Sequence, residues 1–277
     1  MTSPPRWLIC RQRSQGDDGA LVTGGERVVD LNADLGESYG AWRLGDDEAL
    51  LGIVTSANIA CGFHAGDPLT IRRACAGAVA RGVTIGAQVS YRDLAGFGRR
   101  EMTVPPDELA AEVLYQIAAL DGIARTHGGR VGYVKPHGAL YNRAVRDPEQ
   151  AAAIAAAVSS YDARLPLLTL PGSAAATAAV DVGLPVIFEA FADRGYNDDG
   201  TLLPRGTPGA VLTDPELVAA RTASMVVHGV VETASGAALE MSPRSVCVHG
   251  DTPGAVGLAQ AVRTALELAG VTLAPFA

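Results

Sequence analysis

The chain has 277 residues and is acidic, with 30 Asp and Glu against 22 Lys and Arg and a net charge of −8. It has no basic run, and aromatic residues make up only 5% of it, so a nucleic-acid groove is not expected. No apolar stretch approaches the roughly 18 residues that a membrane span needs. The four cysteines form no C-x-x-C pair, as is usual in a reducing compartment. We therefore expect a cytoplasmic protein.

The first 26 residues are rich in Pro, Gly, Ser, Arg and Asp and show no hydrophobic periodicity. Such a segment cannot bury enough apolar surface to fold, so we expect residues 1–26 to be a disordered extension. Residues 27–277 are long enough for one large α/β domain.

From Val28 onward, short apolar runs alternate with helical segments. Pro106–His127 has apolar residues at helical spacing, and further helices are predicted at Asp67–Arg81, Asp214–His228 and Pro253–Ala269. This alternation predicts parallel strands covered by helices. Seven strands are predicted: Val28–Asn32, Ser56–Ala60, Val83–Gln88, Val131–Lys135, Leu167–Leu170, Val186–Phe191 and Ser245–Val248.

Polar residues gather directly after six of these runs. In a β/α barrel the C-terminal ends of all strands share one rim, where catalytic groups collect. Because six polar groups would converge there, the pattern favours a barrel over an open sheet. The six groups are Asn32–Asp34, Cys61–His64, Gln88–Ser90, Lys135–His137, Ala192–Arg194 and His249–Asp251.

Lys135 is the chain's single lysine, against 21 arginines, and it lies at a predicted strand end in VKPHGALYN. An ammonium is a compact charge whose pKa falls on burial, whereas a guanidinium stays charged. Lys135 could therefore move a proton or hold charge.

Three histidines, His64, His137 and His249, lie beside glycines at strand ends, where a ligand can approach closely. We interpret them as site residues. His127 and His228 instead end helices before a glycine, where a cation complements the helix dipole.

Asp30, Asn32 and Asp34 alternate along the first strand, so their side chains share one face. Polar groups inside a barrel are costly unless they are paired or used. Either they bind a metal with His64, or they position a water and a substrate amide, with one carboxylate as general base. No H-x-x-E-H or H-x-x-x-H spacing is present, so the metal site is the second choice of the two and no metal is firmly predicted.

Arg194 follows the sixth strand in Phe191–Tyr196. Its guanidinium could bind a carboxylate or phosphate, or form an ion pair with Asp193 or Asp198.

Five long segments occur in register along the chain: Asp30–Glu37, Ser56–Asp67, Val134–Asn142, Phe191–Tyr196 and Val248–Asp251. Together they closely resemble the bacterial LamB/YcsF family, which is identified with the A subunit of the prokaryotic 5-oxoprolinase. The resemblance implies an irregular seven-stranded parallel β/α barrel, TIM-like and of the glycoside hydrolase/deacetylase type. It also implies ATP-dependent opening of 5-oxo-L-proline to L-glutamate with partner subunits B and C.

For that reaction our hypothesis takes Asp34 as the base and His64 and His137 as proton carriers or orienting groups. Lys135 would stabilise developing charge, and Arg194 would hold an anion. With no phosphate-loop motif in the sequence, we expect the co-substrate ATP to be handled mainly by the partners. The predicted substrate-binding residues are Asn32, Asn58, Gln88, Asp193, Arg194, His249 and Asp251.

The chain departs from the family pattern at the third strand. That strand usually ends Gly-Ala-His-Pro-Ser, but residues 86–90 here read Gly-Ala-Gln-Val-Ser. Because Gln88 cannot exchange a proton, this copy could be slow, altered in substrate, or inactive. The change at Gln88 therefore keeps open a non-catalytic assembly subunit. A second alternative, suggested by fold analogy alone, is a metal-dependent deacetylase or amidohydrolase acting alone.

Overall fold

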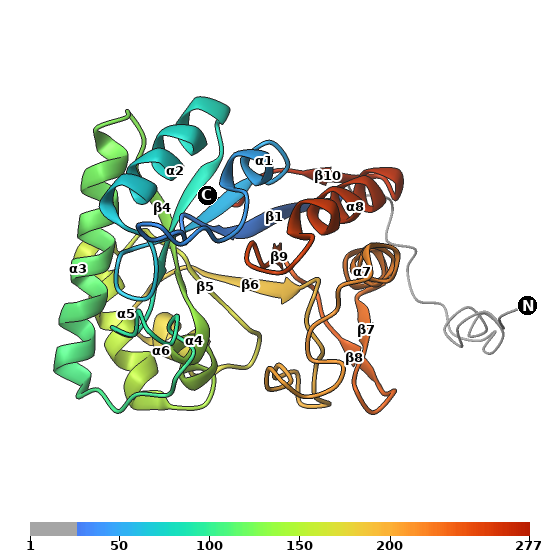
Figure 1. The fold of residues 1–277 in the computed structure, drawn as a ribbon. Helices are drawn as coiled ribbons and strands as arrows, with labels where there is room; N and C mark the ends of the chain where they lie inside the picture. The colour runs from blue at the N-terminus through green and yellow to red at the C-terminus, as the bar shows by residue number, and fades with distance from the viewer. Residues whose placement is uncertain (1–26) are drawn as a thin grey trace, which may run out of the picture.

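The computed structural model describes residues 27–277, so the extension expected at residues 1–26 lies outside the described residues. Parallel strands pair in sequence around a ring, and the last pairs with the first, which closes a barrel (Figure 1). The predicted seven-stranded barrel is confirmed. Its strands are β1 (Arg27–Leu35), β2 (Ser56–Ala60), β3 (Thr84–Val89), β4 (Val131–Pro136), β5 (Leu167–Thr169), β6 (Val186–Phe191) and β9 (Ser245–Val248).

The barrel is irregular because β1 has two sets of partners on the same side. Its first residues, Arg27–Val29, pair with β10 (Val271–Leu273), and Asp30–Ala33 pair with β9. The sequence did not predict β10 or the antiparallel hairpin of β7 (Val230–Glu232) and β8 (Ala238–Glu240). Each of these strands has only three residues and includes a polar one, whereas the equally short β5 lies in the longer, mainly apolar run Leu167–Leu170.

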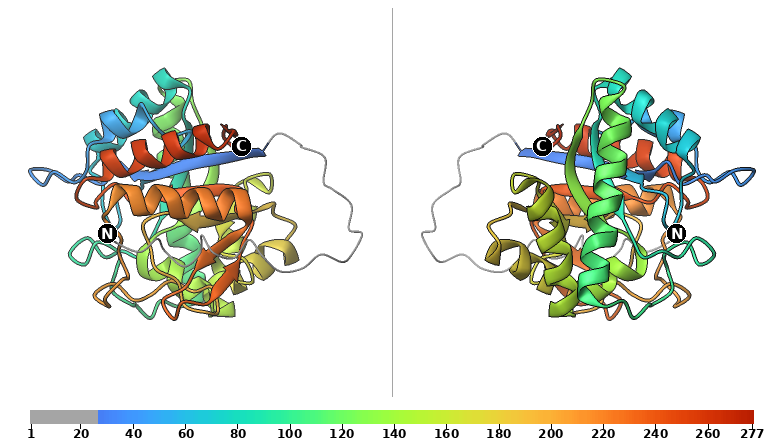
Figure 2. Two further views of the ribbon diagram at one scale, coloured as in Figure 1. Left: turned by 90° about the vertical axis from the view of Figure 1, so that its right-hand side faces the viewer. Right: turned by 90° about the vertical axis from the view of Figure 1, so that its left-hand side faces the viewer.

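Helices cover the outside of the barrel, and the hydrophobic core fills the layer between them and the strands. The side views show α7 beside α8 on one flank and α3 beside α5 on the other (Figure 2). The helices are α1 (Asp47–Leu51), α2 (Pro68–Arg81), α3 (Pro106–Arg125), α4 (Gly138–Ala144), α5 (Pro148–Asp162), α6 (Ala174–Asp181), α7 (Pro215–Ala223) and α8 (Ala255–Leu268). None of these described helices is long and apolar enough to cross a membrane.

Local sequence explains where α2 begins and ends. The Asp67 side chain accepts hydrogen bonds from the backbone N–H groups of Leu69 and Thr70, and Pro68 occupies the first turn. Gly82 ends the helix in the left-handed conformation, with φ of 67°. The predicted helix at Asp214–His228 is instead α7 followed by a π-helical turn at Ser224–His228.

Candidate active site

A cavity of about 480 Å³ opens at the C-terminal rim of the barrel. Five predicted site residues line it: Asp34, Lys135, His137, Arg194 and His249. The other six predicted residues lie behind this lining. They are Asn32, Asn58, His64, Gln88, Asp193 and Asp251.

The barrel interior below the cavity is a hydrogen-bonded polar network. Asn58 donates to Oδ1 of Asn32 at 2.6 Å and to Oδ1 of Asp34 at 2.9 Å, and it accepts from the Tyr133 hydroxyl at 2.6 Å. Asp30 lies one layer deeper and accepts hydrogen bonds from Thr55, Ser56 and Ser245. Alternate residues of β1 therefore do point inward together, and each of them is paired.

Lys135 is buried at the centre of this network. Its Nζ lies 2.8 Å from Oε2 of Glu189, 3.0 Å from Sγ of Cys247 and 3.7 Å from Oδ1 of Asp34. Burial alone would lower its pKa, but the neighbouring Cys247, Glu189 and Asp34 raise that pKa well above the usual range. These neighbours therefore favour the charged ammonium form of Lys135.

Two carboxyl groups at the C-terminal end of β1, Asp34 on the strand and Glu37 just after it, differ in the direction of their pKa shifts. Burial tends to raise the pKa of Asp34, but Lys135 and His249 lower it below its ordinary value. In Glu37, burial and the nearby charges of Asp34 and Asp251 raise the pKa well above its ordinary value. Asp34 is thus an ionised carboxylate facing the cavity, and Glu37 favours the protonated form.

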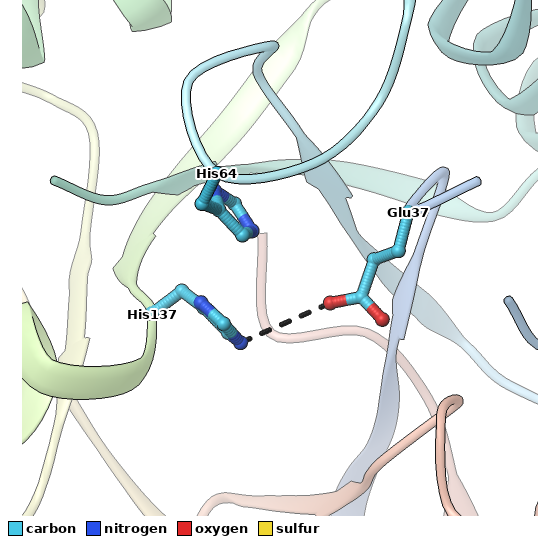
Figure 3. Close-up of side chains that lie close together, drawn as sticks. All are labelled: Glu37, His64 and His137. Carbon is cyan, nitrogen blue, oxygen red and sulfur yellow. Dashed lines mark ion pairs between the residues drawn. The ribbon is translucent and has the colours of Figure 1, made fainter. Parts of the chain in front are cut away.

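A second polar group gathers around Gln88. Its carboxamide oxygen lies 3.2 Å from Nε2 of His64, and its nitrogen donates to Oε1 of Glu37 at 3.2 Å. His64 and His137 stack with ring centroids 4.3 Å apart, and Nε2 of His137 lies 3.9 Å from Oε1 of Glu37. Figure 3 shows Glu37, His64 and His137 converging from three separate chain segments. These three side chains could hold a metal ion, since their donor atoms lie within 4.8 Å of one another.

The loop after β3 covers the two stacked histidines. The Phe97 ring meets His64 and His137 edge-on, with centroid distances of 5.8 and 5.4 Å. Gly98 has φ of 66°, and a Cβ there would clash with Oγ of Ser90 and lie 2.9 Å from Cβ of His64. Only glycine allows this close approach. Burial lowers the pKa of both histidines, that of His64 to about 4, so both rings are neutral at pH 7.

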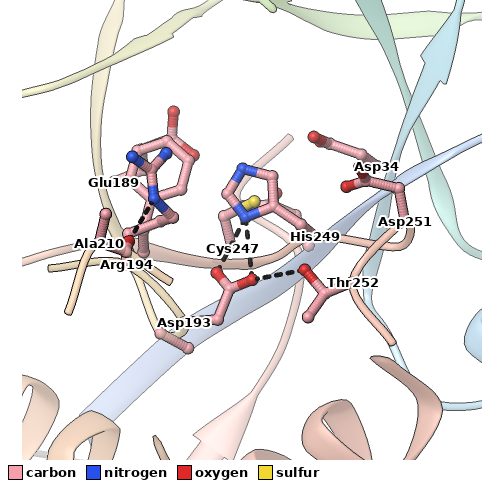
Figure 4. Close-up of polar contacts among 12 residues, drawn as sticks. Asp34, Glu189, Asp193, Arg194, Ala210, Cys247, His249, Asp251 and Thr252 are labelled. Carbon is pink, nitrogen blue, oxygen red and sulfur yellow. Dashed lines mark hydrogen bonds and ion pairs between the residues drawn. The ribbon is translucent and has the colours of Figure 1, made fainter. Parts of the chain in front are cut away.

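On the opposite side of the rim, Asp193 orients His249. Nδ1 of His249 lies 2.9 Å from Oδ1 of Asp193, and the Thr252 hydroxyl donates to the same carboxylate at 3.2 Å (Figure 4). Burial tends to raise the pKa of Asp193, but the charge of His249 and the hydrogen bond between His249 and Asp193 lower it. Because Nδ1 is held by the carboxylate, Nε2 is the ring nitrogen left for the cavity.

Arg194 forms backbone hydrogen bonds that the sequence did not predict. Its Nε donates to the Ala210 carbonyl at 2.8 Å and a terminal nitrogen to the Leu203 carbonyl at 2.6 Å. Within the described residues it forms no ion pair with Asp193 or Asp198. Two of its donors thus bind backbone carbonyls of the loop that contains Leu203 and Ala210. The Arg194 side chain still lines the cavity.

Arg99 and Arg205 are further cations of the lining. Arg99 is ion-paired with Asp251, with 2.6 Å between the terminal nitrogen and Oδ2. Asp251, predicted to bind substrate, therefore holds an arginine at the rim.

Sequence reasoning missed Glu189 and left Glu37 without a role. Glu189 is a charged residue inside an apolar run, on the same inward face as Ile187 and Phe191. A charged residue at an inward-facing position of a predicted strand is the sequence signal that could have identified Glu189 as a site residue. No sequence signal indicated that Glu37 would lie beside His64 and His137, because these three residues follow three different strands.

The fold and the cavity together define a TIM-like β/α-barrel protein with a polar site at the C-terminal rim. A sequence profile described as the LamB/YcsF family matches residues 29–277, and the chain belongs to that family.

Similar proteins agree with this placement. The chain is 61% identical to a Streptomyces avermitilis protein named as the A subunit of 5-oxoprolinase, over 90% of this chain and 100% of the relative. It is 58% identical to a protein of the same name from Mycolicibacterium paratuberculosis, over 90% of this chain and 98% of that relative. A crystal structure titled lactam utilization protein, from Thermus thermophilus, has a TM-score of 0.85 and 48% identity, covering 90% of this chain and 99% of that one.

Proposed function

We propose that this chain is the A subunit of a 5-oxoprolinase, a hydrolase that opens the cyclic amide of 5-oxo-L-proline to give L-glutamate. The observation that carries the proposal is the 61% identity to a relative named for that activity, over 90% of this chain and the full length of the relative. The polar cavity at the rim supports it, because a small anionic lactam needs both cations and proton-transfer groups.

The chemistry explains why ATP is the expected co-substrate. A five-membered lactam resists water because its amide is resonance-stabilised and its leaving nitrogen stays tethered for ring closure. Transfer of a phosphoryl group to the amide oxygen makes the ring carbon electrophilic and gives that carbon a good leaving group. Water then adds to the carbon, and the ring nitrogen, once protonated, leaves as an amine, which gives an acyl phosphate. A second water hydrolyses the acyl phosphate to release L-glutamate and inorganic phosphate.

The cavity residues can be assigned to these steps. Asp34 is ionised and faces the cavity, so it serves as the base that takes a proton from water. Lys135 stabilises the negative charge that develops on oxygen. His137 and, behind it, His64 carry or orient the proton for the ring nitrogen, and His249 positions the substrate. Arg194 uses its remaining donor capacity for an anion.

An A subunit implies other subunits, and we propose subunits B and C as partners in the cytoplasm. The sequence has no G-x-x-x-x-G-K phosphate loop, so ATP is bound mainly by those partners.

The test is glutamate release from 5-oxoproline by the chain with and without ATP and subunits B and C. Release should require all three subunits and ATP. Turnover by the isolated chain without ATP would instead indicate an amidohydrolase acting alone. Unchanged release by an assembly carrying Lys135→Met would indicate that the chain has no catalytic role in that assembly.

A further inference from the structure

We infer that Glu37, His64 and His137 form a binding site for one divalent transition-metal ion, with Zn²⁺ as the best match. Two imidazoles and one carboxylate are a ligand set that zinc enzymes use for catalytic sites, where a fourth position stays open to water or substrate. The inference goes beyond the proposed function and does not depend on it.

The geometry needs only a small adjustment to hold the ion. Tetrahedral zinc with bonds of 2.0–2.2 Å separates its ligand atoms by roughly 3.4 Å. Nε2 of His137 is 3.9 Å from Oε1 of Glu37, and the donor atoms of all three side chains lie within 4.8 Å of one another. Side-chain rotation would have to close a difference of about 0.5 Å for the His137–Glu37 pair and of at most about 1.4 Å for the other pairs.

Charge also favours a cation at this position. Glu37 is almost fully buried, and the carboxylates of Asp34 and Asp251 act on it. Among the described residues, no Lys or Arg forms an ion pair with Glu37: Lys135 is paired with Glu189 and Asp34, and Arg99 with Asp251. A bound dication would displace the proton of Glu37 and supply the positive charge that its carboxylate then needs.

The surroundings distinguish a ligand site from a chance cluster. Gln88 hydrogen-bonds both Glu37 and His64 and so holds these two side chains beside each other. The Phe97 loop closes one side of the histidine pair, while His137 lines the cavity. The open coordination position would therefore face the cavity, where a bound ion polarises a carbonyl or lowers the pKa of a water. His64 and His137 would then be ligands rather than proton carriers.

The test measures metal uptake by the full chain alone, without substrate, ATP or partners. The protein is stripped with a chelator and titrated with Zn²⁺ by calorimetry, and with Co²⁺ by visible absorption. We expect one equivalent of Zn²⁺, with affinity reduced at least about tenfold in Glu37→Gln and in His137→Gln. His228→Gln is the matched control, because His228 is exposed and outside the cavity lining; it should bind like wild type.

Gln88→His is a second variant for the same metal-binding measurement, because it would add a third imidazole beside the ion. It should tighten Zn²⁺ binding about tenfold or more and change the Co²⁺ spectrum. Equal Zn²⁺ affinity in wild type, Glu37→Gln and His137→Gln would overturn the inference, as would an unchanged affinity in Gln88→His. Glu37→Gln is nearly isosteric, so the test stands even where His137→Gln impairs folding. Failure here would leave lactam hydrolysis untouched, because no substrate is present.

Discussion

Nζ of Lys135 lies 2.8 Å from Oε2 of Glu189 in the interior of the barrel, and both side chains are almost completely buried. Each charge is tolerated there because the other is present. Removing one partner of such a pair typically costs about 3–5 kcal/mol, since an uncompensated charge stays buried. The pair therefore links the stability of the barrel to the cation at its active-site end.

Lys135→Met should abolish ATP-dependent glutamate release by the assembly and lower the free energy of unfolding by about 3–5 kcal/mol. Adding Glu189→Gln should recover part of the stability but none of the activity, because the cation beside Asp34 remains absent. Urea unfolding and glutamate release separate the two effects. Activity in the double variant would show that Lys135 serves only to neutralise Glu189.

The barrel and its rim could be predicted because their signals are local. Each strand is an apolar run bounded by polar or glycine residues, and the residues after each run fall on the same rim. The positions of Asp34, Lys135, His137 and His249 in the cavity lining follow directly from that rule.

Pairings between strands could not be predicted in the same way. Glu189 meets Lys135, and Glu37 meets His137, only because of the order and register of separate strands. The same limit applies to Arg194, whose partners are backbone carbonyls of a loop with no sequence periodicity.

Asp193→Asn should reduce kcat/KM by about 100-fold, because His249 would no longer be held in the orientation in which it positions the substrate. An amide in place of the carboxylate no longer fixes Nδ1 of His249 as the protonated nitrogen, and an analogous change in a serine protease costs about 10⁴-fold. Thr252→Val is the matched control, because it removes one hydrogen bond to the same carboxylate and should change kcat/KM only a few-fold. Equal losses in both variants would point to a packing defect rather than to histidine orientation.

Asp193 should also contribute to acid stability. His249 holds the folded-state pKa of Asp193 below its ordinary value, so the unfolded chain binds this proton more readily than the folded chain. The stabilisation is therefore fully present above about pH 4, the unfolded pKa, and is lost as the pH falls through the lower folded pKa. Urea unfolding from pH 7 to pH 3 should show a constant gap between wild type and Asp193→Asn down to about pH 5, and a shrinking gap below pH 4. A gap that widens on acidification would contradict the assignment.

Gln88→His should raise glutamate release by the assembly about tenfold. Gln88 lies between His64 and Glu37, and its carboxamide can hold them in place but cannot exchange a proton. An imidazole at the same position can both transfer a proton and coordinate a metal ion, and a positioned acid–base group commonly contributes 10²- to 10⁴-fold. Gln88→Leu is the comparison variant, because it removes both hydrogen bonds and should lower activity and stability together. A loss of activity in Gln88→His, with the fold intact by circular dichroism, would mean that the amide itself is the group the substrate requires.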